Sequence, residues 1–297
     1  MPYVNVVEWV QPRSGEKVMN EVDTANASKG EQYRVLSDVM RRRRSVRQFE
    51  RGRKVSRDTL LSVAESARWA PTGANSQCWD LIIVDDPVVR DAVIDIFVEQ
   101  SNRLFVKAKG FPAVSKAYLS NTVAIFIVVG DPRWKDAFPQ HSEDAEGVDE
   151  YAANNENIYF CSLGAVIQNI QLAVTAQGLT SAWLSGGGEV STNQALSELL
   201  GYPPYLSACG TIPVGYPKKD VRMRYRRPLE QLVHWNGYAT TQFRPQGMLE
   251  HYLDRLRPFL MYRNTERIED WEDAREKCGD WYDAFSSPEP NPSGQLE

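Results

Sequence analysis

The chain has 297 residues, a formal net charge of −5, 42% hydrophobic residues and 25% charged residues, a composition typical of a globular protein with a large buried core. The mildly acidic balance argues against general nucleic-acid binding. No apolar run reaches the length of a membrane span, and Met1–Val10 is too short and too polar for a signal peptide. We therefore expect a cytoplasmic protein with no nucleic-acid partner and no membrane partner.

The cysteines and histidines show no metal-ligand spacing. No CxxC pair exists, and no histidine stands beside a cysteine in a ligand pattern. The sequence therefore predicts no metal site, and cysteines that stay reduced. The residues concerned are Cys78, Cys161, Cys209, Cys278, His141, His234 and His251.

The first half of the chain predicts three helices and two strands. Apolar residues recur at helical spacing over residues 31–44, and Ser56 is a candidate N-cap for a second helix. Pro71 and Gly73 then break the chain. Residues 131–150 are polar, acidic and contain two prolines, so we expect a surface loop there. The remaining predictions are strands over 81–84 and 122–129 and a helix over 87–106.

The second half predicts a long apolar helix followed by short elements. Residues 156–177 form the strongest helical pattern, and Gly178 stops it. Because helices alternate with strands, the pattern indicates a layered α/β or α+β domain. The other expected elements are strands over 180–184 and 208–214, a glycine loop over 186–188, a helix over 191–200 closed by Gly201, and tail helices over 248–256 and 268–285.

Two arginine clusters suit an anionic ligand. The first is Arg43-Arg44-Ser45-Val46-Arg47, and the second includes Arg224 and Arg226 after Gly215-Tyr216-Pro217. Guanidinium groups make paired, charge-assisted hydrogen bonds to phosphate. The alternative for each cluster is a solvated basic surface.

Two loops suit a flat ligand. Residues 70–79 combine Pro71 and Gly73, which fix a turn, with Asn75, whose amide both donates and accepts hydrogen bonds. Residues 185–188, Ser-Gly-Gly-Gly, can present backbone N–H groups to a ligand. The alternatives are an ordinary helix-to-strand loop and a flexible turn.

Together these motifs resemble the FMN-dependent nitroreductase family in order, spacing and type, over about residues 36–235. The resemblance implies an α+β protein with a three-layer α/β/α fold, a mostly antiparallel central sheet and an intertwined homodimer that holds FMN at its interface. It implies an N-terminal arm over 1–35, an FMN-binding domain over 36–237 and a helical extension over 238–297 that packs on the domain or on the partner subunit. The last ten residues, rich in proline, are expected to be disordered.

The resemblance also assigns the cofactor contacts. Arg43, Ser45 and Arg47 would contact the FMN phosphate and ribityl chain, with Arg44 contributing at least through its backbone. Arg226 and Arg224 would complete the phosphate clamp. The flavin ring would be lined by Pro71, Thr72, Gly73 and Asn75, and its N5 atom by Ser185, Gly186 and Gly187. No catalytic side chain is implied, because the flavin carries the chemistry.

The implied reaction is a ping-pong cycle in which NADH or NADPH reduces the flavin, and the flavin reduces a nitroaromatic, quinone or enone. A reductive dehalogenase or a flavin-fragmenting enzyme of the same fold is an alternative, although the latter usually has Asp in place of Ser45. A non-catalytic FMN-binding or phosphate-binding module is a second alternative. The sequence departs from the family pattern at Cys78, at the glycine triplet and in the long arm and tail, and residues 131–150 are a candidate cover for the substrate in a dehalogenase.

Overall fold

The computed structural model describes residues 29–107, 116–137, 148–219, 221, 226 and 229–251. The predictions for the arm before residue 29, for residues 138–147, for Arg224 and for the tail beyond residue 251 lie outside this part of the chain. The chain divides into two compact units, Met1–Arg41 and Arg42–Glu297. Helix α1 (Lys29–Arg42) is the described element of the first unit, and the other elements belong to the second.

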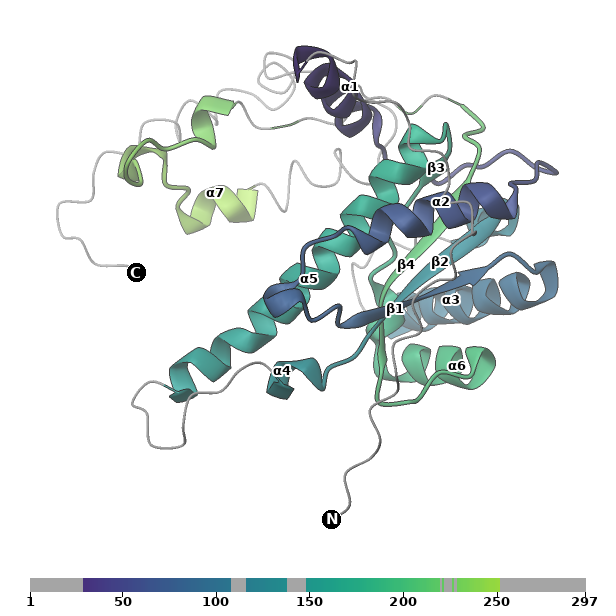
Figure 1. The fold of residues 1–297 in the computed structure, drawn as a ribbon. Coiled ribbons are helices and arrows are strands. Elements are labelled where there is room, and N and C mark those ends of the chain that lie inside the picture. Colours follow the sequence, from purple (N-terminus) through teal and green to yellow (C-terminus); the bar gives the residue numbers. More distant parts are fainter. Residues whose placement is uncertain are drawn as a thin grey trace, which may run out of the picture. The chain divides into compact units, whose positions relative to one another are not determined.

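A four-stranded antiparallel sheet forms the middle layer of the second unit (Figure 1). The strand order is β1-β2-β4-β3, so the longest pairings are those of β2 with its two neighbours. Phe126 of β2 lies opposite Ile83 on one side and Ile212 on the other. The strands are β1 (Trp79–Val84), β2 (Ala124–Gly130), β3 (Thr180–Ser181) and β4 (Ser207–Gly215).

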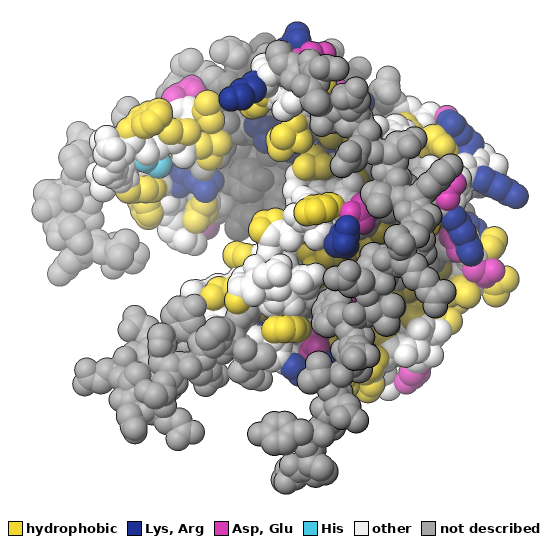
Figure 2. Space-filling view, in the orientation of Figure 1, with side chains coloured by type: hydrophobic (Ala, Val, Ile, Leu, Met, Phe, Trp, Pro, Cys, Tyr) yellow, Lys and Arg dark blue, Asp and Glu magenta, His cyan; other side chains and the backbone are white. Residues whose placement is uncertain are grey.

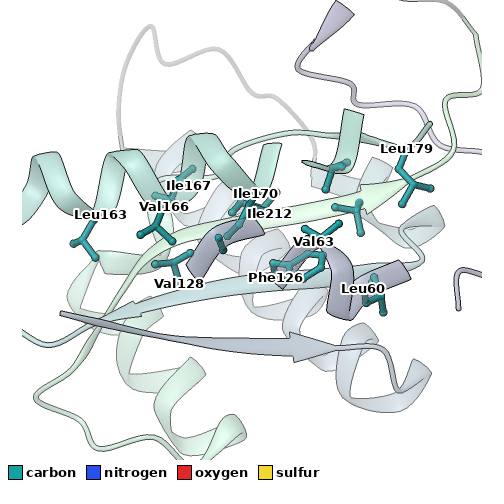
Figure 3. Packing of buried hydrophobic residues seen from close by; sticks show 14 of the residues in the cluster. Leu60, Val63, Phe126, Val128, Leu163, Val166, Ile167, Ile170, Leu179 and Ile212 are labelled. Atoms are coloured by element: carbon teal, nitrogen blue, oxygen red, sulfur yellow. The ribbon is translucent and has the colours of Figure 1, made fainter. Parts of the chain in front are cut away.

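Helices cover both faces of this sheet. Phe126 and Val128 pack with α2 (Arg57–Arg68) and α5 (Val148–Ala176), as Figure 3 shows. The intervening residue of β2, Ile127, points to the other face, where it packs with α3 (Pro87–Lys107) and α6 (Val190–Leu200). Because β2 is buried on both faces, its sequence is apolar throughout instead of alternating. The predicted three-layer α/β/α fold with an antiparallel sheet is confirmed.

Some predicted boundaries were wrong. The first helix ends at Arg42, which leaves Arg43 and Arg44 outside any helix or strand. Helix α5 begins at Val148 instead of residue 156, because its first turns are polar and carry no apolar face that a sequence pattern would detect. The polar segment 131–150 is not all loop, since it holds helix α4 (Trp134–Ala137) and the start of α5. Strand β3 is shorter than predicted, and the chain pairs with β4 again only at Leu184.

The expectation that no apolar run is long enough to span a membrane was also wrong. Within α5, Asn154–Ala176 has the length and mean hydropathy of such a span. Half of its most apolar window is buried inside the protein, where Leu163, Val166 and Ile170 pack on the sheet. The apolar character of α5 is therefore explained by its place in the core.

Two predicted helix ends are confirmed. The Ser56 hydroxyl accepts a hydrogen bond from the Thr59 N–H at 3.1 Å, as an N-cap should. Gly201 closes α6 in the left-handed conformation at φ 76°. The predicted tail helix starting at Met248 lies partly in α7 (Gln246–His251). Short 3₁₀ turns are found at Gly73–Asn75, Lys116–Asn121, Gly186–Gly188, Leu229–Gln231 and Thr240–Gln242.

Candidate functional site

The arginine segment, residues 43–49, is anchored along one end of the sheet. The Val46 N–H donates to the carbonyl of Ser181 in β3 at 2.9 Å. Further along, Phe49 pairs with Pro217, just beyond the end of β4. Val46 and Phe49 are each only 1% exposed, whereas Ser45 and Arg47 face outward. The buried residues thus fix the backbone and leave polar side chains free to meet a ligand.

Arg43 and Arg44 are partly buried and lie near a third guanidinium, that of Arg226. Desolvation lowers the pKa of Arg43, and the charge of Arg226 lowers it further. The pKa of Arg44 is lowered by desolvation and by both other arginines. Like charges held together at a partly buried position favour an anion between them. The two sequence clusters therefore meet in the fold through Arg226, although they are far apart in the chain.

The turn between α2 and β1 holds strained backbone. Ala74, Asn75 and Gln77 have φ values of 50°, 52° and 45°, in the region that disfavours residues with a side chain. Strain of about 1–3 kcal/mol at such a residue persists only where neighbouring contacts enforce it, and it is common at ligand-binding sites. We call residues 71–77 the strained loop.

Specific hydrogen bonds hold the strained loop in place. The Gly73 N–H donates to the Ser162 hydroxyl of α5 at 3.0 Å. The Gln77 N–H donates to the Thr72 side chain at 3.0 Å. The side chains of Pro71 and Asn75 remain exposed, so the loop presents them outward from a rigid base.

The glycine loop, residues 185–188, packs closely on the start of β4. A Cβ atom on Gly187 would lie 2.8 Å from the Ala208 carbonyl oxygen, so no larger residue fits there without a backbone shift. A Cβ on Gly186 would lie 2.5 Å from the side-chain nitrogen of Gln100. Both glycines are thus explained by close approach, and the alternative of a flexible turn is not needed.

Within one chain, the structure brings some predicted site residues together and keeps others apart. Ser45 bridges to Ser181, which pairs with Val214 near the end of β4. The strained loop leads into Trp79 of β1. Trp79 pairs with Gly130 of β2, and Gly130 pairs with Ser207 at the start of β4, so these residues form one row across the sheet. Seven residues along β4, a length of about 23 Å, separate the row at Ser207 from the row at Val214. The glycine loop lies at the Ser207 end and connects to Ser181 along β4.

A buried polar network that sequence patterns did not identify lies behind the glycine loop. At its centre is Gln100 of α3, which is only 2% exposed. Its side-chain N–H groups donate to the Gly186 carbonyl at 2.6 Å and to the Glu189 carboxylate at 2.7 Å, and its oxygen accepts from the Lys116 ammonium. Arg103 also donates to Glu189, at 3.1 Å. A sequence signal existed, because Gln100 continues the buried face of α3 one turn after Phe97.

The ionisation of this network follows from burial and contact. The hydrogen bond from Gln100 is the largest of the contacts that lower the pKa of Glu189, so this carboxylate stays ionised at neutral pH. The pKa of Lys116 is lowered to about 8, mainly by desolvation. The nearby charge of Glu189 opposes this shift, and the charge of Arg103 adds to it. Among the described residues, the back of the glycine loop therefore carries two basic groups, Arg103 and Lys116, against the carboxylate of Glu189.

The described residues contain no group of histidine, cysteine or acidic side chains that could hold a metal ion. Among them, Cys78, Cys161 and Cys209 are free thiols. Burial raises the pKa of Cys78, so this thiol is protonated and packs as a core residue. Cys78, which stands where the motif of residues 70–79 usually has proline, is thus part of the hydrophobic core.

Comparison with known proteins extends these observations. The model of the nitroreductase family matches residues 40–216. Iodotyrosine deiodinase 1 of Homo sapiens is 27% identical over 209 residues, covering 66% of each chain, so the match spans just under two thirds of the human protein. An NADPH-dependent oxidoreductase of Staphylococcus haemolyticus is 24% identical over 244 residues, which cover 79% of this chain and 86% of the relative.

A solved structure shows the same fold. The BluB-like flavoprotein of Clostridium difficile 630 superposes with a TM-score of 0.52 at 19% identity, covering 68% of this chain and 99% of the other. The residues that the family model matches contain the arginine segment, the strained loop and the glycine loop. Arg224 and Arg226 lie beyond residue 216, where the family match ends.

Proposed function

Because this chain belongs to the nitroreductase family and is an NAD(P)H-dependent FMN oxidoreductase, we propose that it reduces an electron-poor small organic acceptor such as a nitroaromatic, quinone or enone. The observation that carries the proposal is the proximity of the Arg226 guanidinium to those of Arg43 and Arg44, which are partly buried. A flavin mononucleotide ends in a phosphate, which is the anion that such a cluster would hold.

The chemistry that bound FMN would supply is hydride transfer from NAD(P)H to the acceptor, in a ping-pong cycle. The residues of the chain hold and orient it. Arg43 and Arg226 bind the phosphate, and the Ser45 hydroxyl, which faces outward beside them, hydrogen bonds to the phosphate or ribityl chain. Backbone N–H groups of the glycine loop would lie near the ring. The basic charge behind that loop favours negative charge on the ring side.

The site also needs a second copy of the chain. The strained loop and the arginine segment lie at opposite ends of β4, so the side chains of Pro71 and Asn75 do not meet the arginine cluster of the same chain. In a homodimer they would meet that of the partner. Exposed hydrophobic side chains support such an interface: Figure 2 shows several at the surface, and among the described residues Trp69, Phe160 and Trp235 are 74%, 53% and 85% exposed.

Purification tests the cofactor assignment directly. The protein is expected to be yellow, or to take up added FMN with quenching of flavin fluorescence, and NADPH or NADH should bleach it without oxygen. A colourless protein that binds no added FMN would contradict the proposal.

Reductive dehalogenation is a second candidate, which the match to human iodotyrosine deiodinase 1 favours. The two reactions differ in product. Assays with the reduced protein should compare nitroaromatics, quinones and enones with an iodinated or brominated phenol, following halide release. Halide release faster than nitro reduction would select the second candidate over the first.

A further inference from the structure

We propose that Gln100 is a positioning residue that sets the direction of the backbone N–H groups in the glycine loop, and thereby the contact of this loop with the flavin. The inference rests on the proposed FMN function. It concerns a residue of α3 that lies outside every motif recognised in the sequence.

The Gly186–Gly187 peptide group has a fixed direction. Gln100 donates to the Gly186 carbonyl at 2.6 Å, so this carbonyl points toward α3. The N–H of Gly187 belongs to the same peptide unit, and in a trans peptide the C=O and N–H point in opposite directions. The Gly187 N–H therefore points away from Gln100. The 3₁₀ turn does not use this donor, since its closing bond is donated by Glu189 to Gly186.

Gln100 is itself held in one orientation. Its oxygen accepts from the Lys116 ammonium, and its nitrogen donates to two acceptors, Gly186 and Glu189. An amide flip would direct the nitrogen at an ammonium and the oxygen at two acceptors, so the observed orientation is the only one that satisfies all partners. Because Gln100 is 2% exposed, water offers no substitute for these bonds.

The glycine triplet departs from the commoner family pattern. A Cβ on Gly186 would lie 2.5 Å from the nitrogen and 2.6 Å from the oxygen of the Gln100 amide. Gly186 is therefore the residue that lets Gln100 reach the backbone. Gln100 and Gly186 act as a matched pair, and their contact explains why this chain has glycine at that place in the loop.

Gln100→Met removes the amide and keeps the length of the side chain. We expect hydrogen–deuterium exchange of residues 185–189 to become about threefold to tenfold faster, as for the loss of one neutral hydrogen bond, the one to the Gly186 carbonyl. FMN affinity should weaken by a similar factor, and the midpoint potential of the bound flavin should shift. Gln194→Met is the matched control, because Gln194 is exposed on α6 and bonds to Glu198 of the same helix.

Gly186→Ala approaches the same contact from the other side and serves if Gln100→Met does not fold. The added methyl group must displace the Gln100 amide, so the loop exchange, FMN affinity and flavin potential should change in the same way. The inference is overturned if folded variants keep the wild-type FMN affinity and potential, even when the loop exchanges faster. If the wild-type protein takes up no FMN, the proposed function fails instead, and the exchange rates still report whether Gln100 anchors the loop.

Discussion

The guanidinium of Arg226 lies close enough to that of Arg43 to lower the pKa of Arg43, although the two residues flank nearly the whole of the layered domain in sequence. Such proximity of like charges destabilises the protein by itself. It becomes favourable when an anion binds between them. We therefore expect the same pair of residues to have opposite effects on the apo-protein and on its complex with FMN.

Replacing Arg43 should separate these two effects. Arg43→Met keeps the apolar part of the side chain and removes its charge. FMN binding should weaken about ten- to a hundred-fold, since a charge-assisted hydrogen bond contributes about 1.5–3 kcal/mol. The melting temperature of the apo-protein should stay the same or rise. Arg226→Ala should weaken FMN binding to a similar degree, whereas Arg57→Ala, which removes an exposed arginine paired with Asp85, should not. Unchanged FMN affinity in both site variants would refute the phosphate assignment.

Mixing two defective variants tests whether the site is shared between subunits. Arg43→Ala damages the arginine segment, and Asn75→Ala damages the strained loop. If each site takes one segment from each subunit, random exchange of subunits restores about a quarter of the wild-type sites, because half of the dimers are mixed and each carries one intact site. Titration of FMN after unfolding and refolding of the mixture measures this recovery. No recovery, in a mixture shown to form mixed dimers, means that both segments serve the same subunit.

The strained loop should respond in opposite ways to two substitutions at one position. Ala74 is exposed and has φ 50°, so a β-branched residue there gains no burial and increases the strain. Ala74→Val should destabilise the protein by about 1–3 kcal/mol, whereas Ala74→Gly should be neutral or slightly stabilising. Urea unfolding of both variants gives the comparison. Equal stabilities would show that the loop relaxes, and that its geometry is not enforced by the bonds to Ser162 and Thr72.

Lys116 should make stability depend on pH above neutrality. Its pKa is lowered to about 8 in the folded protein, and the unfolded chain keeps the proton up to its ordinary value of 10.5. Between these values the unfolded state binds more protons, so this lysine makes the free energy of unfolding rise with pH; below about 8 its contribution is constant. Lys116→Met should remove that rise, and Lys54→Met, at an exposed lysine, should retain it. Urea unfolding at pH 7 and pH 9.5 measures the difference, and parallel changes in all three proteins would contradict the prediction.

The fold was largely predictable because its signals are local. The apolar run at residues 124–130, the N-cap at Ser56 and the stop at Gly201 each identify an element from neighbouring residues alone. The start of α5 and the short helix α4 were missed, because they lie in polar sequence where helix formation leaves no apolar stripe. The positions of Arg43, Ser45, Asn75 and the glycine loop as ligand candidates came from motifs, and motifs do not show distances.

The sequence by itself determined the layered fold, the buried strands and the family, since hydrophobic periodicity, capping residues and motif spacing are written along the chain. Only the tertiary structure decided which charges meet and which do not. It brought Arg226 to Arg43, it placed the strained loop at the other end of β4, and it set Gln100 against Gly186. Those relationships depend on how strands align and helices pack, and contacts between residues distant in the chain leave no local pattern.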